Sequence, residues 1–414
     1  MTTQTATTSE STHAASTALP VMCVGGSPSS GSTLLADLLD STPGLMCPPE
    51  LYVLCVESAY CFDDAFRATA RARQPFGVHA QYVDPVRFFN DKYAEHTGVT
   101  SAVLDDLLTN ARDLREFMFG LAAQVGKHRS ISPAGFVEKT PINVNCAPMF
   151  CHMFPEGVFV HIVRDGRDVC ASLVRRGFTL YEAALIWMSQ VHAGRLAAVA
   201  ENAVEVRYED LLERPFEIAA DLGARVGTSV DPDDIQARLL DNTYRAGLPR
   251  IASWQVPEFS TEVRRAHTYK DRLSAKNIAW LESLALVQVG PNGMSHVIAR
   301  FGDLLRQYNY VPDNESYDIT LPLDRLLQCH GEFLRKSRNV TSWTDRALVM
   351  SSRASDWSAT SSPVSVLAQS PRLPDTLRQA ATVGEGQFAA ETLQLLSFQI
   401  EAEQRENASD APAT

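Results

Sequence analysis

The sequence has no long uncharged apolar run, because no window reaches the roughly 18 residues that a helix needs to cross a bilayer. We therefore expect no membrane span. The first 19 residues are rich in Thr, Ser and Ala and contain neither a basic start nor an apolar core, so we expect a disordered tail there and no signal peptide. These absences favour a cytoplasmic protein.

Positive charge is scarce as well. The formal net charge is -12 at pH 7, and the pI is about 5.3. This balance disfavours general binding of nucleic acid or of an anionic membrane, so we expect no nucleic-acid partner. An anionic ligand must then be held by a local basic pocket.

Closely spaced pairs of cysteines are also missing, because the eight cysteines include no C-x-x-C pair. Most of them lie in apolar surroundings, such as Cys23 in VMCVG and Cys170 in DVCASL. We predict reduced, buried thiols rather than metal ligands or disulfides.

What the chain does contain is an ordinary globular composition, with 45% hydrophobic and 21% charged residues among 414. Short apolar runs alternate with helical patterns over about 20–240, which indicates βαβ units and a parallel sheet covered on both faces. The predicted fold class is α/β: a three-layer α/β/α P-loop fold with a central parallel sheet, a helical insertion and a C-terminal extension.

The predicted domain spans residues 20–310, with its mainly helical insertion at 50–130. Residues 242–310 are expected to be mostly loop and helix. Residues 311–400 are expected to form a mostly helical extension, and residues 401–414 a disordered tail.

The most informative segment is Val21–Leu35, VMCVGGSPSSGSTLL, in which an apolar strand leads through Gly, Ser and Pro into a helix pattern. Gly26 and Gly31 let backbone amides converge on an anion, and the N-terminus of the following helix adds its dipole. The spacing from Gly26 to Thr33 is that of a nucleoside-triphosphate loop, but Ser32 stands where the lysine belongs. The segment therefore predicts a phosphate cradle that does not suit a triphosphate bound with magnesium.

A second anion site is predicted in VHIVRDGRDVCASLVRR, residues 160–176. A strand ends at Arg164, an Asp-Gly turn follows, and a helix begins after it. Ser172 and Arg176 share one face of that helix, and Arg164 lies within reach of it. Two guanidiniums and a hydroxyl make a phosphate clamp, although a solvated basic helix end also explains this segment when it is taken alone. Two anion sites on one sheet suit a nucleotide that carries phosphate at both ends.

GSPSSGSTLL followed by RDGRDVCASL resembles the paired 5′-phosphosulfate and 3′-phosphate loops of sulfotransferases, and it is most similar to those of tyrosylprotein sulfotransferases and their bacterial relatives. EKTP (138–141), RYEDLL (207–212) and STEV (260–263) resemble the family's lysine segment, Tyr-Glu segment and late nucleotide-covering loop. The resemblance spans about 21–310. It implies transfer of a sulfonyl group from 3′-phosphoadenosine 5′-phosphosulfate (PAPS) to a hydroxyl acceptor, with adenosine 3′,5′-bisphosphate as the other product and no metal ion.

The resemblance also implies which residues bind PAPS. The 3′-phosphate would lie against Arg164, Ser172 and Arg176. Tyr208 would contact the nucleotide, and Ser260 would belong to the covering segment, which includes Lys270 or Lys276. The 5′-phosphosulfate would lie in the first loop, formed by Gly26, Ser27, Pro28, Ser29, Ser30, Gly31, Ser32 and Thr33.

Glu50 and Lys139 are the predicted catalytic residues. By the resemblance, Glu50 takes the proton of the acceptor hydroxyl during in-line attack on sulfur, and Lys139 neutralises charge on the bridging oxygen or the sulfonyl group. Without the resemblance, Glu50 is also explained as a carboxylate at a helix N-terminus, and Lys139 as a surface lysine at the end of a strand. His79 and His96 are rival bases in the insertion.

One position departs from the family, whose loop usually has Arg or Lys after the proline, where this chain has Ser29. A charge-stabilising donor at such a place contributes about 2.7–4 kcal/mol to catalysis. We expect the charge from Lys139 alone or from a basic residue of the insertion; otherwise the activity is slow or lost. The candidates in the insertion are Arg71, Arg73 and Arg87.

Three functions therefore stay open: a sulfotransferase, a P-loop phosphotransferase that uses ATP, and a non-catalytic protein that retains the nucleotide fold. The acceptor stays open between a peptide tyrosine, a sugar and a secondary-metabolite phenol. The insertion is expected on the acceptor side, where its aromatics explain either a pocket or a domain core. A homodimer is compatible with the sequence.

Overall fold

The structure is a computed structural model that describes residues 19–55, 57–72, 91–241, 266–289, 295–314 and 348–351. Five parallel strands form its central sheet, in the order β2-β3-β1-β4-β5. Their bounds are Val21–Gly26 for β1, Leu45–Met46 for β2, Gly135–Lys139 for β3, Val158–Val163 for β4 and Ala203–Arg207 for β5. The predicted parallel sheet is confirmed. Because the strands are parallel, their carboxyl ends meet at one edge, where ligands of such sheets bind.

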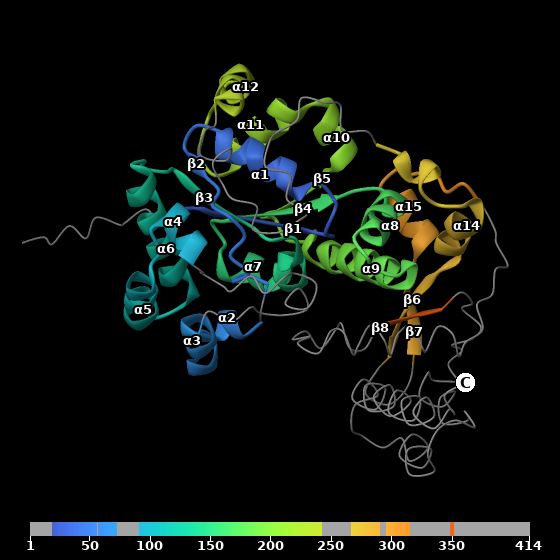
Figure 1. The fold of residues 1–414 in the computed structure, drawn as a ribbon, viewed down its shortest axis with the longest axis horizontal. Coiled ribbons are helices and arrows are strands. Elements are labelled where there is room, and N and C mark those ends of the chain that lie inside the picture. Colours follow the sequence, from blue (N-terminus) through green and yellow to red (C-terminus); the bar gives the residue numbers. More distant parts are fainter. Residues whose placement is uncertain are drawn as a thin grey trace, which may run out of the picture.

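Helices cover both faces of this sheet (Figure 1). In β1, Val21 and Cys23 belong to one hydrophobic cluster, whereas Met22 and Val24 belong to another, so the strand has no solvent face. The cluster with Met22 includes residues of α1 (Ser32–Ser41), α10 (Tyr208–Glu213), α11 (Pro215–Arg225) and α12 (Pro232–Leu240). The cluster with Val21 includes residues of η2 (Pro141–Cys146), α7 (Ala147–Met153) and the end of α9 (Leu180–Ala197). The three predicted layers are therefore present.

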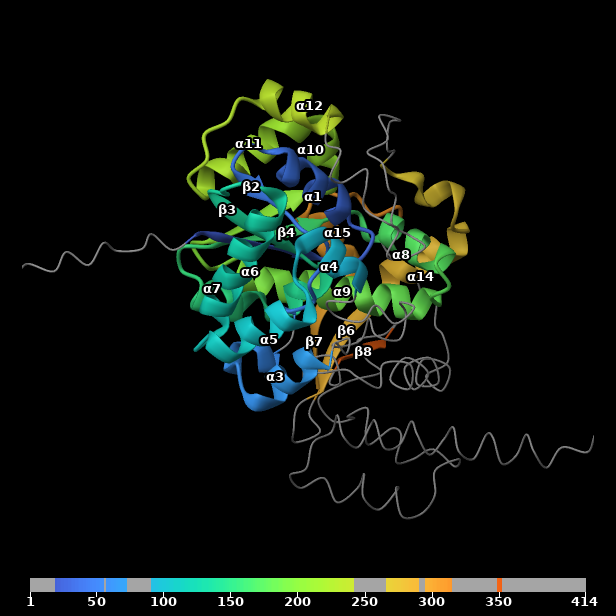
Figure 2. The ribbon, with the colours of Figure 1, turned by 60° about the vertical axis from the view of Figure 1, so that its left-hand side comes forward.

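The helical insertion is confirmed over the described part of residues 50–130. Its helices are α2 (Glu57–Cys61), α3 (Asp64–Arg71), α4 (Asp91–Thr97), α5 (Ser101–Asn110) and α6 (Leu114–Arg129). Figures 1 and 2 both show these helices below the β3 side of the sheet. Phe62, Phe66 and Phe117 lie in their shared core, with ring centroids 5.5–6.2 Å apart. These insertion aromatics are core residues, whereas Phe76, Tyr82, Phe88 and Phe89 lie outside the described residues.

A third hydrophobic cluster lies beyond the carboxyl end of β4. Its helices are α8 (Gly166–Arg175), α9, η3 (Thr268–Asp271), α14 (Ala275–Ser283) and α15 (Phe301–Gln307). Next to it lies a small antiparallel sheet in the order β7-β6-β8, with bounds Ala285–Val289 for β6, Ser295–Arg300 for β7 and Leu348–Ser351 for β8.

The strands of this small sheet were not predicted. β6 and β7 lie within residues 242–310, where mostly loop and helix was expected, and the four residues of β8 lie within the extension that was expected to be mostly helical. The physical reason is that ladder hydrogen bonds from neighbouring strands decide the structure of such short apolar runs, rather than their local propensity. The rest of the extension and both tails, apart from Leu19, lie outside the described residues.

The two-residue strand β2 was not predicted, yet it directs the chain toward Glu50. Asp40 of α1 accepts a hydrogen bond from the backbone amide of Cys47 at 2.7 Å, and Arg129 of α6 pairs with the same carboxylate at 2.7 Å. Asp40 is fully buried, so this contact is part of the core and connects α1, α6 and the segment that leads to Glu50.

The cysteines of the described part are free, and six of these seven side chains are buried, Cys61 being the exposed one. Burial raises the pKa of Cys23, Cys55 and Cys170 well above the ordinary thiol value, as expected for unreactive core thiols. Within the described ranges, no helix combines the length and the hydropathy needed to cross a membrane.

Candidate functional site

The predicted phosphate cradle is a tight loop between β1 and α1. The backbone amide of Ser30 donates to the carbonyl of Ser27 at 3.1 Å, and Leu35 donates to the carbonyl of Gly31, which caps α1. Ser29 and Gly31 both have a left-handed backbone, with φ of 71° and 97°. The loop therefore turns back on itself before α1, as do the loops that hold anions with successive backbone amides.

The serine hydroxyls of this loop are enclosed. Ser27, Ser30 and Ser32 are buried, and among the described residues the Ser30 hydroxyl has no hydrogen-bond partner. A buried hydroxyl without a partner costs free energy, and a bound anion would supply the missing acceptor. A bound phosphate or sulfate group would therefore give the Ser30 hydroxyl the acceptor that the loop itself does not provide.

Arg164 lies where β4 ends and contacts this loop directly. Its Nη1 donates to the carbonyl of Ser29 at 3.2 Å, its Nη2 lies 3.4 Å from Asp168 Oδ2, and its guanidinium carbon lies 4.5 Å from the centroid of the Tyr208 ring. Its Nε is buried and has no partner in the described part of the chain. Tyr208, the first residue of α10, packs closely against the loop, since a Cβ on Gly31 would lie 2.2 Å from its ring. Arg164, Tyr208 and the loop therefore form one cluster.

Ser172 and Arg176 lie on the same side of α8, with Arg176 at its C-cap. Ser172 is half-buried. Arg176 extends to the first loop, where its Nη1 donates to Ser29 Oγ at 3.0 Å. The two predicted anion sites are thus in direct contact through Ser29.

Glu50 and Lys139, predicted separately, form an ion pair. Lys139 Nζ donates to Glu50 Oε1, and the side chains are 5% and 15% exposed, respectively. The Tyr52 hydroxyl donates to the other oxygen, Glu50 Oε2, at 2.7 Å. Lys139 is the last residue of β3 and pairs in register with Val24 of β1, just before the first loop. The base and cation candidates therefore lie together beside the cradle.

A buried carboxylate, Glu138, holds this arrangement in place. It accepts hydrogen bonds from the backbone amide of Leu51 at 3.1 Å, from Thr140 Oγ1 at 2.6 Å and from Asn143 Nδ2. Burial raises the pKa of Glu138 despite these bonds. Glu138 thereby connects β3 to the backbone that carries Glu50.

Sequence analysis missed Tyr52, Glu138 and Asp168 as functional candidates. Glu138 acts through a contact with Leu51, 87 positions away, which no local pattern reveals. Tyr52 lies only two positions from Glu50, but no sequence pattern shows that its hydroxyl donates to that carboxylate. A signal did exist for Glu138, because a carboxylate at an internal position of a buried strand requires partners.

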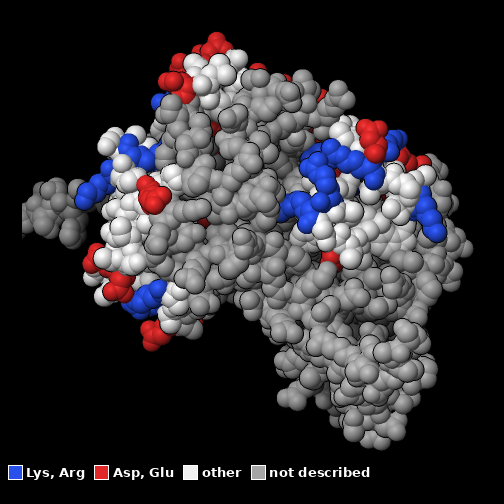
Figure 3. All heavy atoms as spheres, in the orientation of Figure 1, with Lys and Arg blue, Asp and Glu red and all other residues white. Residues whose placement is uncertain are grey.

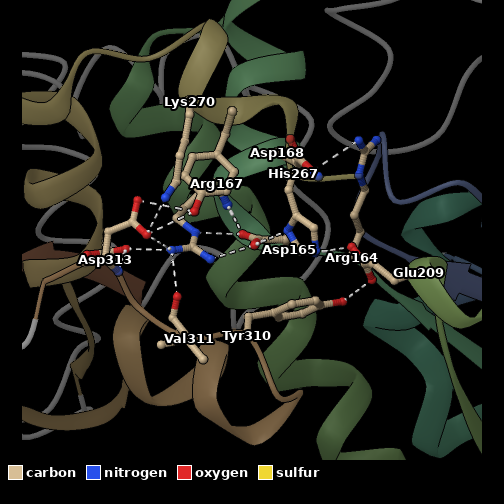
Figure 4. A network of polar contacts seen from close by, with 12 residues as sticks. Arg164, Asp165, Arg167, Asp168, Glu209, His267, Lys270, Tyr310, Val311 and Asp313 are labelled. Carbon is tan, nitrogen blue, oxygen red and sulfur yellow. Dashed lines mark hydrogen bonds and ion pairs between the residues drawn. The ribbon is translucent and has the colours of Figure 1, made fainter. Parts of the chain in front are cut away.

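Asp168 connects Arg164 to a later segment of the chain. Its two oxygens accept from the backbone amide of His267 at 2.7 Å and from Thr268 Oγ1 at 3.1 Å. Figure 4 shows Asp168 between Arg164 and His267. The helix that carries the predicted 3′-phosphate clamp is therefore tied to the chain that follows residue 265.

Several other candidates lie away from this cluster or outside the described part. Lys270 pairs with Asp313 at 3.0 Å, Lys276 is exposed on α14, and Arg71 pairs with Asp105 on the surface of the insertion. His96 lies on α4, where burial and His128 lower its pKa. Ser260, His79, Arg73 and Arg87 lie outside the described residues.

Three positively charged side chains thus lie close together in this acidic protein. Arg164, Arg176 and Lys139 converge on one loop although the formal net charge is -12. Figure 3 also shows Lys and Arg side chains on the surface of the molecule over α8 and α14. An acidic protein that binds an anion needs such a local cluster of positive side chains.

Comparisons with known proteins agree on one family. A family model described as "Sulfotransferase family" matches residues 20–232. Protein-tyrosine sulfotransferase 2 of Gallus gallus is 24% identical over 163 residues, and protein-tyrosine sulfotransferase 1 of Danio rerio is 23% identical over 163 residues. Each alignment covers 39% of this chain, but only 36% and 37% of the respective relative.

Two solved structures are also similar. The sulfotransferase domain from the curacin biosynthetic pathway is 17% identical, with a TM-score of 0.46 over 71% of this chain and 99% of that domain. The sulfotransferase domain of the Synechococcus PCC 7002 olefin synthase is 21% identical, with a TM-score of 0.38 over 54% of this chain and 79% of that one.

Proposed function

This chain belongs to the sulfotransferase family, and from that premise we propose that it transfers the sulfonyl group of PAPS to a hydroxyl acceptor. The observation that carries the proposal is the convergence of residues from every strand of the sheet. Glu50 follows β2, Lys139 ends β3, the loop follows β1, Arg164 follows β4 and Tyr208 follows β5. Such a meeting at the carboxyl edge is where a nucleotide is expected.

We propose that both ends of the donor are bound by residues of this cluster. Backbone amides and hydroxyls of Gly26 to Thr33 bind the 5′-phosphosulfate, and the buried, unpartnered Ser30 hydroxyl supports this. Arg164 and Ser172 bind the 3′-phosphate, and the buried Arg164 Nε supplies a donor for it. The Tyr208 ring, against Gly31, contacts the nucleotide.

The chemistry that we propose is an in-line displacement at sulfur. The acceptor oxygen forms a bond to sulfur while the bond between sulfur and the bridging oxygen breaks, and the electron pair leaves with adenosine 3′,5′-bisphosphate. Glu50 takes the proton of the acceptor hydroxyl, and Lys139 stabilises the charge that develops on the bridging oxygen. The Glu50–Lys139 contact supports these roles, because it places the carboxylate and the ammonium next to each other, and Lys139 ends the strand that pairs with β1 just before the loop.

A phenolic hydroxyl is the acceptor type with most support. The Tyr52 phenol donates to Glu50 Oε2 at 2.7 Å. A phenol therefore makes the same hydrogen bond to this carboxylate that an acceptor hydroxyl must make before Glu50 takes its proton. Two matched relatives are named as protein-tyrosine sulfotransferases, which favours a peptide tyrosine over a sugar or a small phenol.

Transfer from PAPS labelled in its sulfonyl group tests this proposal, with tyrosine peptides, sugars and small phenols as acceptors. We expect labelled product from the wild type and a loss of about 100-fold to 10,000-fold in Glu50→Gln, the range for removal of a general base. Glu116→Gln, at a partly exposed position of the insertion, serves as the matched control. Binding of PAPS without transfer to any acceptor class would instead indicate a non-catalytic protein.

A further inference from the structure

The loop residue that lacks a positive side chain, Ser29, is held by two guanidiniums. Arg164 Nη1 donates to its backbone carbonyl at 3.2 Å, and Arg176 Nη1 donates to its Oγ at 3.0 Å. Ser29 has a left-handed backbone, with φ of 71°. Position 29 therefore has cationic neighbours from β4 and α8 in place of a cation of its own.

The two arginines differ in their surroundings. Arg164 pairs with Asp168 and lies over the Tyr208 ring, on the side where the nucleotide is proposed. Arg176 is instead close enough to Glu50 and Tyr52 for both to act on its charge. Burial lowers the pKa of Arg176, and these two neighbours counteract that effect. Arg176 therefore differs from Arg164 in two ways: it contacts the side chain of Ser29, and the charge of Glu50 acts on it.

We propose that Arg176 supplies, from the end of α8, the positive charge that loop position 29 lacks, and that it binds the 5′-phosphosulfate end of the donor. This inference rests on the proposed function and assigns Arg176 a different role from the 3′-phosphate contact that sequence similarity implied. A guanidinium has five N–H donors in one plane, so it can contact Ser29 and an oxyanion at the same time.

The proposal also explains why position 29 is small. A Lys or Arg side chain there would compete for the space of Arg176 and bring a second cation within a few ångströms of it, which is unfavourable in a partly buried site. Serine offers an oxygen that orients the guanidinium.

Calorimetry with three nucleotides separates the two roles of Arg176. Adenosine 3′,5′-bisphosphate carries both phosphates, adenosine 5′-phosphate only the first-loop group, and adenosine 3′-phosphate only the other. For Arg176→Ala we expect the affinity for both 5′-phosphorylated nucleotides to fall about tenfold, the loss of one charged hydrogen bond. Binding of adenosine 3′-phosphate should stay unchanged.

Three further variants serve as controls for the role of Arg176. Ser172→Ala should reduce the ratio by which the protein binds the bisphosphate more tightly than adenosine 5′-phosphate. Arg176→Lys should retain most of the affinity for both 5′-phosphorylated nucleotides. Arg175→Ala, at the exposed neighbouring position, should leave all three affinities unchanged. Loss of adenosine 3′-phosphate binding in Arg176→Ala, or no change with any nucleotide, would overturn the inference alone. A wild type that binds no nucleotide would instead overturn the proposed function.

A rescue variant provides a second readout. If Arg176 supplies the charge of position 29, then Ser29→Arg should restore 5′-phosphate affinity in the Arg176→Ala background and lower it in the wild-type background. Opposite effects of Ser29→Arg on affinity in the two backgrounds are expected only when positions 29 and 176 contact the same anion. Equal effects of Ser29→Arg in both backgrounds would contradict the shared role.

Discussion

Gly31 is the residue where the loop, the first helix and the Tyr208 ring meet. Its φ of 97° is left-handed, and a Cβ on it would lie 2.2 Å from Tyr208 Cδ2. Gly177 has almost the same φ, 96°, but a Cβ on it would meet nothing within 4 Å. The two glycines therefore share the backbone requirement and differ only in the ring contact.

We predict that Gly177→Ala lowers the free energy of unfolding by about 1–2 kcal/mol, the cost of a left-handed alanine, and that Gly31→Ala lowers it further, because its Cβ would also overlap the Tyr208 ring. Only Gly31→Ala should also displace Tyr208 and weaken binding of adenosine 3′,5′-bisphosphate. Urea unfolding and calorimetry measure the two effects. Equal nucleotide affinity in both variants would show that the Tyr208 contact is not part of the site.

Single residues also show what sequence could and could not predict. The loop Gly26–Thr33, Arg164 and Tyr208 were predicted from local motifs, and the structure brings them together. The contact of Arg176 with Ser29 was not predicted, because the two residues are 147 positions apart and no local spacing relates them. For the same reason the candidates for a substitute cation were sought in the insertion, where Arg71 pairs with Asp105 instead.

Glu205 connects four elements at the edge of the sheet. It lies in β5, contacts His161 of β4 at 3.1 Å, accepts from Tyr308 beside α15, and lies 3.6 Å from Arg195 of α9. Burial by itself raises the pKa of Glu205, but the hydrogen bonds from His161 and Tyr308 and the nearby charges outweigh it and leave the pKa below the ordinary value. A lowered folded-state pKa means that the ionised carboxylate stabilises the fold above the unfolded pKa, and that this stabilisation is lost as the pH falls through the folded pKa.

Glu205→Gln should therefore lower the free energy of unfolding at pH 7 by about 1.5–3 kcal/mol, the contribution of hydrogen bonds to a charged group. The difference from wild type should shrink as the pH falls into the acid range. Unfolding curves at a series of pH values measure this. Asp303→Asn on α15 is the control, because its ion pair with Arg306 is about half exposed and should contribute less than about 1 kcal/mol. A constant difference at all pH values would contradict the role of the carboxylate.

At the scale of elements, the alternation of apolar runs and helical patterns predicted the parallel sheet and the helices that cover it. The exceptions are short. β2 has two residues and depends on its contacts with β3, and β6 and β7 pair with each other as antiparallel strands. Such elements are decided by pairing partners rather than by their own residues.

Across the whole molecule, one buried ion network joins the central domain to its later segments. Arg167 pairs with Asp165 at 2.7 Å and with Glu282 of α14 at 2.9 Å, and it donates to the carbonyl of Val311 at 3.0 Å. Figure 4 shows Arg167 between Asp165 on one side and Val311 and Asp313 on the other. The side chains of Arg167, Asp165 and Glu282 are at most 2% exposed.

Removing one partner of a buried ion pair leaves the others uncompensated, so Arg167→Ala should lower the free energy of unfolding by about 3–5 kcal/mol. Arg71→Ala, which removes an exposed pair with Asp105, should cost less than about 1 kcal/mol. Urea midpoints for the two variants give the comparison. A loss for Arg167→Ala no larger than that for Arg71→Ala would mean that the network does not hold the segments together.

The central claim is that a single site binds a nucleotide with phosphate at both ends. Calorimetric titration with adenosine 3′,5′-bisphosphate, in the absence and presence of magnesium, tests it most directly. We predict one binding site per chain, an affinity that does not depend on magnesium, and loss of binding in the Arg164→Ala/Ser172→Ala double variant. Absence of binding by the wild type at millimolar nucleotide, or undiminished binding by the double variant, would contradict it.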